Sequence, residues 1–161
     1  MLLSGKSLEI PPVTARDAAV DAAFVLAGAS GLVALLGAER WWRAAPSREF
    51  WIALRAVQAL AFAYAVLAGL LYLAHDRASS GLYYLYALLP IAINFVAEQL
   101  RIVAADHVLT SRDLEDAAEV GELPEEEQQG IVLAILRREM GVMALAALVV
   151  CFLALRAAGT Y

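Results

Sequence analysis

The sequence contains little of the chemistry on which enzymes and metal proteins commonly depend. Its 161 residues include one cysteine, Cys151, and two histidines, so no intrachain disulfide can form. The motifs Gly-x-Ser-x-Gly, His-Glu-x-x-His and Cys-x-x-Cys, the P-loop and the Asp-x-Asp-x-Asp-Gly calcium loop are all absent. These absences favour a non-enzymatic protein, and we expect no catalytic residues, no cofactor and no metal site.

Long hydrophobic runs, by contrast, dominate the chain. Hydrophobic residues make up 62% of it and its mean hydropathy is +0.68, whereas about 45–50% apolar residues is usual in soluble globular proteins. The excess falls into four blocks, each near the ~20 residues with which a helix crosses a bilayer. We therefore predict an all-α polytopic membrane protein, a single antiparallel four-helix bundle over residues 17–158, with spans at about 17–38, 50–74, 82–100 and 138–157.

The residues before the first span, 1–16, are predicted to form a short N-terminal segment. They have neither a basic start nor an apolar stretch of adequate length, so we expect no cleavable signal peptide. Thr14 with Asp17 three residues later is typical of a capping box, which predicts that a helix begins there.

Lysine and arginine are distributed unevenly between the two ends of the predicted spans. Seven of them lie in or beside the first and third connections: Arg40, Arg43, Arg48, Arg101, Arg112, Arg137 and Arg138. Four lie on the opposite side: Lys6, Arg16, Arg77 and Arg156. Because cytoplasmic loops carry an excess of Lys and Arg, we expect both termini outside, in a multi-pass protein of the bacterial cytoplasmic membrane.

The third connection, about 101–137, has the pattern of a helical hairpin. Apolar residues continue at helical spacing past the third span, at Leu100, Val103, His107 or Val108, Leu114 and Ala118. Gly121 and then Pro124 are typical of one helix ending and another beginning. We expect the third and fourth helices to run beyond the membrane and to form a cytoplasmic hairpin that turns at Gly121.

This predicted hairpin is strongly acidic. Nine acidic residues and one basic residue, Arg112, lie between Asp106 and Glu127. An acidic docking surface for a basic protein partner is one interpretation, and a solvated face that keeps the hairpin soluble is the other. The docking candidates are Glu119, Glu122, Glu125, Glu126 and Glu127. With a net charge of −5, nucleic acid is not expected as a partner.

Polar residues also interrupt the apolar spans near the predicted cytoplasmic side. Ionisable groups in a bilayer face the bundle interior and pair with one another. We therefore expect Glu98 and Glu139 to face Arg55, Arg101 and one of Arg137 or Arg138. Three interpretations stay open: hydrogen bonds that hold the bundle, a pocket for a small lipid-like ligand, and an ion or proton path along Asn94 and Glu98. The candidate residues are Arg55, Gln58, Asn94, Glu98, Arg101, Arg138 and Glu139.

Small residues four apart predict close helix packing at two places. Ala27 with Gly31 and Ala65 with Gly69 form such steps, which suit a compact bundle or a homo-oligomer equally well. Besides membrane lipid, a second copy of the chain is therefore a candidate partner. His75 and His107 are expected on opposite sides of the membrane, so one subunit cannot supply both as haem ligands.

Parts of the sequence resemble two groups of known membrane proteins. The stretch RAVQALAFAY, from Arg55 to Tyr64, and the four-span architecture resemble the membrane glutathione-dependent enzymes of eicosanoid metabolism, which would imply a glutathione-type transferase. The stretch lacks the Asn and Glu that this family carries between its Arg and Tyr. Four further stretches are similar to small four-helix integral membrane proteins of high-GC bacteria with no assigned activity, which implies a fold and a location only: WWRAAPSREFW, FVAEQLRIVAADHVL, LPEEEQQ and AILRREMGVMALAALVV.

These observations lead to one main hypothesis and two alternatives. We expect a non-enzymatic membrane subunit that binds a partner protein or a small lipid-like ligand through the polar cluster and the hairpin. The first alternative is a transporter or channel subunit, and the second is the glutathione-type transferase.

Overall fold

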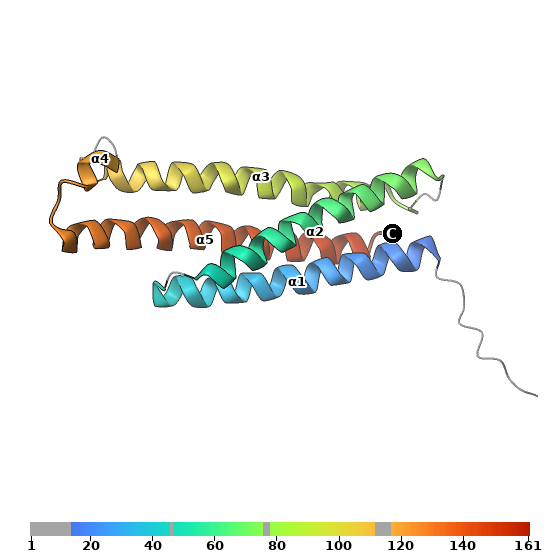
Figure 1. Cartoon of the computed structure of the whole chain (residues 1–161). Coiled ribbons are helices and arrows are strands. Elements are labelled where there is room, and N and C mark those ends of the chain that lie inside the picture. Colours follow the sequence, from blue (N-terminus) through green and yellow to red (C-terminus); the bar gives the residue numbers. More distant parts are fainter. Residues whose placement is uncertain (1–13, 46, 76–77, 112–116) are drawn as a thin grey trace, which may run out of the picture.

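The computed structural model describes residues 14–45, 47–75, 78–111 and 117–161, and within them every regular element is a helix. Four helices are long: α1 (Ala15–Arg43), α2 (Arg48–Leu73), α3 (Gly81–Thr110) and α5 (Glu125–Ala158), while the short α4 (Ala117–Val120) lies between α3 and α5 (Figure 1). Each long helix is long and apolar enough to cross a membrane. The predictions of an all-α chain and of a multi-pass membrane protein are confirmed.

Side-chain caps define where three of the helices begin. The Thr14 hydroxyl accepts a hydrogen bond from the Asp17 N–H at 3.2 Å, and the Asp17 carboxylate accepts one from the Thr14 N–H at 3.2 Å. The predicted capping box is therefore present. Ser47 caps α2 and Ser80 caps α3 in the same way, through the N–H groups of Phe50 and Leu82. These bonds satisfy amides that have no partner within the helix.

The four long helices pack side by side around a core rich in alanine. Helix α5 contacts α1 and α3, and α2 contacts the same two helices. Small side chains permit this close approach, and among the described glycines the least space is left at Gly37 on α1. A Cβ atom there would lie 2.6 Å from the Phe50 ring and 2.7 Å from Cβ of Ala144. The contact between α1, α2 and α5 therefore depends on glycine at this position.

The two predicted small-residue steps have different surroundings. On α1, Ala27 is buried and a Cβ at Gly31 would lie 3.4 Å from Sγ of Cys151, so this face meets α5. On α2, Ala65 is buried but Gly69 is exposed, with no atom within 4 Å of a built Cβ. Only the first step is a complete packing face within one copy of the chain.

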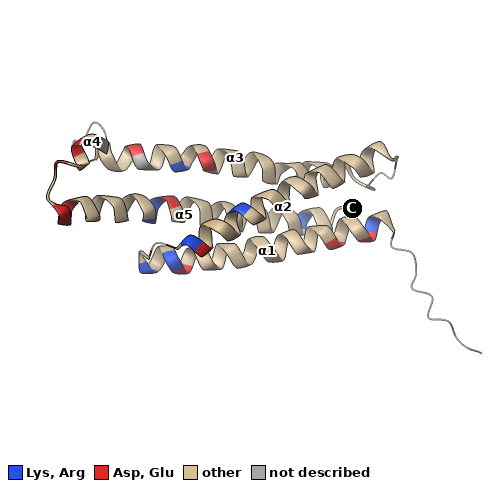
Figure 2. Cartoon of the chain, in the orientation of Figure 1, with Lys and Arg blue, Asp and Glu red and all other residues tan. Residues whose placement is uncertain are grey.

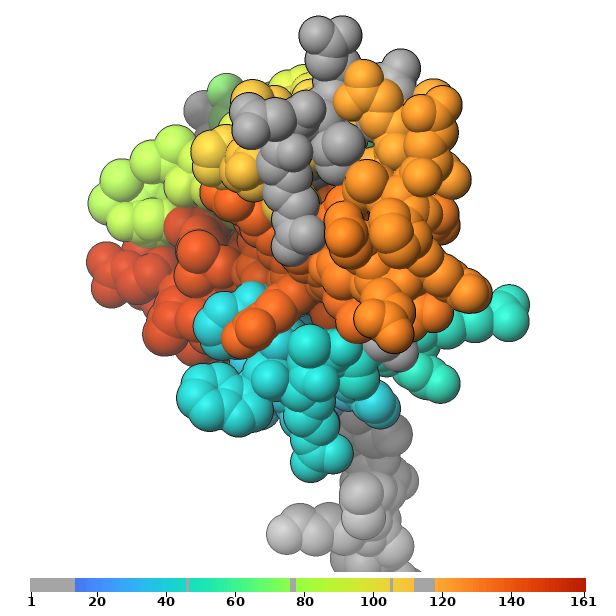
Figure 3. All heavy atoms as spheres, turned by 90° about the vertical axis from the view of Figure 1, so that its left-hand side faces the viewer, coloured from blue at the N-terminus to red at the C-terminus, as the bar shows by residue number. Residues whose placement is uncertain are grey.

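Helices α3 and α5 run in opposite directions past the ends of α1 and α2, and α4 lies at their far end (Figure 1). We call this part the extension: residues 101–110 of α3, then α4, and residues 121–137. Seen from that end, α4 and the start of α5, in orange, lie above the cyan end of α1 (Figure 3). The Gln128 amide steadies the turn, because it donates to the carbonyl oxygens of Gly121 at 3.2 Å and Leu123 at 2.8 Å.

The first arm of the extension differs from its prediction. Helix α3 ends at Thr110 rather than near Gly121, and the predicted position Leu114 lies outside the described residues. Leu100 and Val103 are 51% and 59% exposed, whereas Ala97, Ala104 and Val108 are buried. The predicted apolar spacing was therefore right at Val108 and wrong at Leu100 and Val103, because small residues that pack closely give a weaker signal than large exposed ones.

Candidate functional site

Glu98 is the centre of a polar cluster formed by α2 and α3. One oxygen, Oε1, accepts hydrogen bonds from Nη1 of Arg55 and, at 3.0 Å, from Nε2 of Gln58. The other oxygen, Oε2, lies 3.5 Å from Nη2 of Arg55 and 3.2 Å from Nε of Arg101. The Arg101 contact is an ion pair without hydrogen-bond geometry, since Nε makes no directed bond. Both carboxylate oxygens of Glu98 therefore already have cationic or amide partners.

The cluster reaches α5 through Arg101. Its Nη1 atom lies 3.9 Å from Oε2 of Glu139, and its guanidinium lies 5.5 Å from the centre of the Trp51 ring on α2. Two arginines, Arg55 and Arg101, thus face two glutamates, so the charges of the cluster cancel. Among the described residues, this cluster joins three of the four long helices through charged groups.

Two of the predicted members lie apart from these groups. Arg138 lies on α5 but borders the groove between α5 and α1, not the side where Glu98 and Arg101 meet. Asn94 is half-buried one turn before Glu98 and makes no hydrogen bond to the cluster within the described part of the chain. The expectation that Glu98 and Glu139 also face one of Arg137 or Arg138 is therefore wrong. Helical spacing alone could not show that α5 turns these arginines toward α1.

The cluster lies at one end of an uncharged stretch of the molecule. Residues 82–97 of α3 and 140–155 of α5 include no charged side chain, and charges gather toward the two ends of the helices (Figure 2). The exposed fraction is 53% for the Arg55 side chain and 24% for that of Glu98. An arginine near the end of an apolar membrane span extends its long side chain toward the headgroups.

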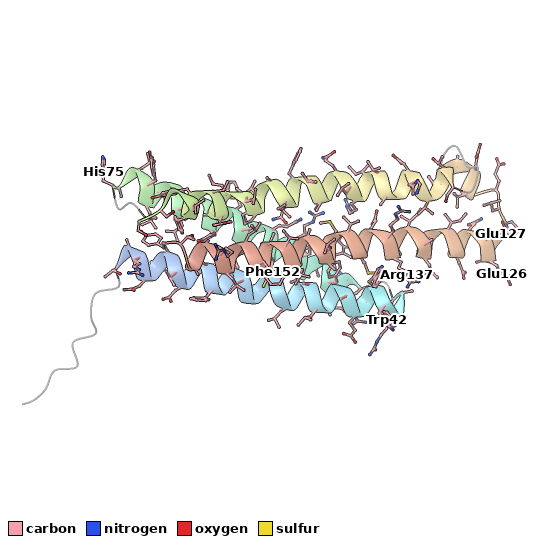
Figure 4. All side chains as sticks on the ribbon, turned by 180° about the vertical axis from the view of Figure 1, so that it is seen from behind. Trp42, His75, Glu126, Glu127, Arg137 and Phe152 are labelled. Carbon is pink, nitrogen blue, oxygen red and sulfur yellow. The ribbon has the colours of Figure 1, made fainter. Side chains whose placement is uncertain are left out.

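The docking candidates lie at the far end of the extension, away from the cluster. Glu122, Glu125, Glu126 and Glu127 are exposed, and Figure 4 shows Glu126 and Glu127 at the tip. Glu119 on α4 is half-buried. Four acidic residues of the hairpin prediction remain. Asp106 is exposed on α3, whereas Asp113, Glu115 and Asp116 lie outside the described residues, as does Arg112.

Next to these glutamates, α5 has a groove of about 440 Å³ on the extension. Val132 and Leu133 on it are 50% and 42% exposed. Its other lining residues are Glu125, Gln128, Gln129 and Leu136. The sequence did not predict this groove, because helical spacing could not show where α1 ends alongside α5.

A second groove, of about 490 Å³, lies between α1 and α5. Trp41 and Arg138 stand at its end nearest the extension, and the other lining residues are apolar: Ala34, Leu35, Ala38, Gly141, Val142, Ala144, Leu145 and Leu148. Sequence reasoning missed this groove, since its two walls are about a hundred residues apart in the chain.

The two histidines are far apart. His75 lies just after α2 at the end opposite the extension (Figure 4), and His107 is exposed near the end of α3. No three His, Cys, Asp or Glu side chains among the described residues are close enough to hold a metal ion.

Comparison of the chain with protein-family models, with curated proteins and with solved structures gives no match. The two resemblances stated from the sequence therefore stay predictions, and the function has to be inferred from the geometry of this chain.

Proposed function

We propose that this protein is a non-enzymatic membrane subunit whose extension binds a basic, amphipathic helix of a protein partner. The observation that carries this proposal is the groove on α5 beyond the ends of α1 and α2. Exposed apolar surface of this kind is typical of interaction sites when it lies outside the lipid.

The groove is one part of an apolar stripe along α5, and the other part of this stripe is buried inside the bundle. Val132, Leu136, Met143 and Ala147 follow one another at spacings of four and seven residues, which places them on one side of α5. Met143 and Ala147 are buried in the core, whereas Val132 is half exposed. A helix laid along the extension would cover this stripe as the neighbouring helices cover it within the bundle, which is a common mode of recognition.

The charge of the tip favours a basic partner over an acidic one. Glu125, Glu126 and Glu127 are exposed in the first turn of α5, and Glu125 also borders the groove. A second copy of the chain would bring two acidic tips together, so it suits the groove less well than a helix carrying Lys or Arg.

The proposed orientation places the extension in the cytoplasm and both termini outside. Its support is the excess of Lys and Arg near the first and third connections. In this arrangement the polar cluster fixes the base of the extension to α2, because Glu98 and Arg101 belong to α3 and Arg55 to α2. The ion path along Asn94 and Glu98 and the glutathione-type transferase stay predictions that no described contact favours.

A binding assay with designed peptides tests the proposal. The protein is placed in nanodiscs of zwitterionic lipid, and a fluorescent amphipathic peptide with Leu and Lys faces is titrated by anisotropy. The matched peptide has Glu in place of Lys. We expect the Lys peptide to bind and the Glu peptide not to bind, with affinity that falls as salt rises.

Variants then locate the contact. Val132→Asn with Leu136→Asn should weaken binding by at least about tenfold, since each buried aliphatic side chain contributes roughly 1.5–3 kcal/mol. The matched control is Ile102→Asn with Val103→Asn, two exposed apolar residues on the other arm. Equal binding of both peptides, or an equal loss in the control, would overturn the proposal.

A further inference from the structure

A different face of the molecule, independent of the proposed docking of a partner, has a groove of its own. It is the groove of about 490 Å³ between α1 and α5. Its volume lies within the ~300–1,000 Å³ common for small-molecule sites. Leu35 and Leu145 on its walls are 71% and 62% exposed, so in a membrane the groove opens toward lipid tails.

One end of the groove has a distinct chemistry. The Trp41 indole lies directly on Gly141 of α5, because a Cβ at Gly141 would be 3.0 Å from Nε1 and 3.1 Å from Cδ1 of the ring. The guanidinium of Arg137 lies 5.3 Å from the centre of the same ring, and Trp42 packs edge-on against it at 6.4 Å. Figure 4 shows Arg137 and Trp42 close together at the end of α1. Tryptophan at this depth is typical of the headgroup level of a membrane.

Charge is unbalanced at this end of the groove. Neither Arg137 nor Arg138 forms an ion pair with a carboxylate of a described residue. The neighbouring glutamates already have cations, since Glu139 faces Arg101 and Glu39 pairs with Arg43 at 3.1 Å. Within the described part of the chain, two arginines beside an apolar groove therefore have no carboxylate partner.

We propose that this groove binds one anionic glycerophospholipid. One acyl chain lies along Leu35, Leu145 and Leu148, and the phosphate binds the guanidinium groups of Arg137 and Arg138. Basic pockets between membrane helices bind acidic headgroups in this way. Arginine suits the role because its planar group donates two parallel hydrogen bonds to a phosphate.

Quenching of Trp41 fluorescence by brominated lipid tests this site in the full-length protein. Trp42→Phe and Trp51→Phe leave Trp41 as the reporter. The protein is reconstituted in phosphatidylcholine vesicles that contain the same small fraction of either dibrominated phosphatidylglycerol or dibrominated phosphatidylcholine. We expect markedly stronger quenching by the phosphatidylglycerol at an equal mole fraction, and equal quenching by the two lipids would overturn the proposal.

Two sets of variants separate a site from general surface attraction. Arg137→Gln with Arg138→Gln should lower the association constant for phosphatidylglycerol by roughly fivefold per arginine. The control Arg43→Gln with Arg48→Gln removes the same charge from the same end of the molecule, and it should leave the preference unchanged. Ala38→Leu, which narrows the groove while keeping the arginines, should also weaken the preference. An equal loss in the control, or full quenching in Ala38→Leu, would contradict the site.

Discussion

Arg55 on α2 and Glu98 on α3 form an ion pair between two helices, although 43 residues separate them in the sequence. Gln58 on the same face of α2 strengthens the pair, because its amide donates to Glu98 and its carbonyl oxygen accepts from Arg55 at 2.7 Å. Glu98 thus holds α2 and α3 together at the level where the extension begins.

Replacing Glu98 should destabilise the bundle without changing its shape. In Glu98→Gln, Arg55 and Arg101 keep their positive charges but lose the carboxylate between them. We expect a loss of about 1–2 kcal/mol in the free energy of unfolding, near the upper end for polar contacts between membrane helices. The measurement is the unfolding midpoint in mixed micelles. Gln99→Ala, at an exposed neighbouring position, is the control, and equal stability of both variants would refute the role of the ion pair.

Adding one methyl group at Gly37 should disturb the contact between α1, α2 and α5. The Cβ of Gly37→Ala would meet the Phe50 ring and Cβ of Ala144 at less than 3 Å, so either the helices separate or Phe50 leaves its position. Overpacking of this kind costs about 1–3 kcal/mol. The matched control is Gly28→Ala on the same helix, where no atom lies within 4 Å of the new Cβ. The unfolding temperature in detergent should fall for the first variant only.

The contact between α1 and α5 can be tested with a cross-link to the native cysteine. A Cβ at Gly31 would lie 3.4 Å from Sγ of Cys151, which is close to the roughly 3 Å between a Cβ and the partner's sulfur that an S–S bond of about 2.05 Å implies. We expect Gly31→Cys to form an intrachain disulfide with Cys151 under mild oxidation. The readout is that neither thiol reacts with a maleimide polymer, so that the band does not shift on a denaturing gel. Gly28→Cys should remain reduced, and a disulfide-linked dimer in place of the intrachain bond would contradict this packing.

Orientation in the membrane can be measured by thiol labelling of whole cells. In a Cys151→Ala background, Ser79→Cys lies at one end of the molecule and Glu126→Cys at the other, both at exposed positions. With both termini outside, a membrane-impermeant maleimide should label Ser79→Cys in intact cells. Glu126→Cys should react only after the membrane is permeabilised. The opposite pattern would reverse the proposed orientation and place the acidic tip outside.

The sequence alone determined the environment of the chain and the nature of its elements. Four apolar blocks of membrane-spanning length dictate four helices, since a backbone in lipid must satisfy its hydrogen bonds within each segment. Thr14 and Asp17 marked the first helix start because a capping box is a local interaction. Arg55, Gln58, Glu98 and Arg101 could be grouped in advance, since charges in a bilayer need one another and these residues lie at one depth.

Only the tertiary structure decided which sides of the helices face each other. It turned Arg138 away from Glu98 and toward Trp41, and it left Leu100 and Val103 exposed while Ala104 and Val108 were buried. The rotation of a helix about its axis depends on close fits such as Gly37 against Phe50 and Gly141 against Trp41. Hydropathy cannot register these fits, because lipid and protein interior are equally apolar, so the two grooves became visible only when α1, α2 and α5 were placed together.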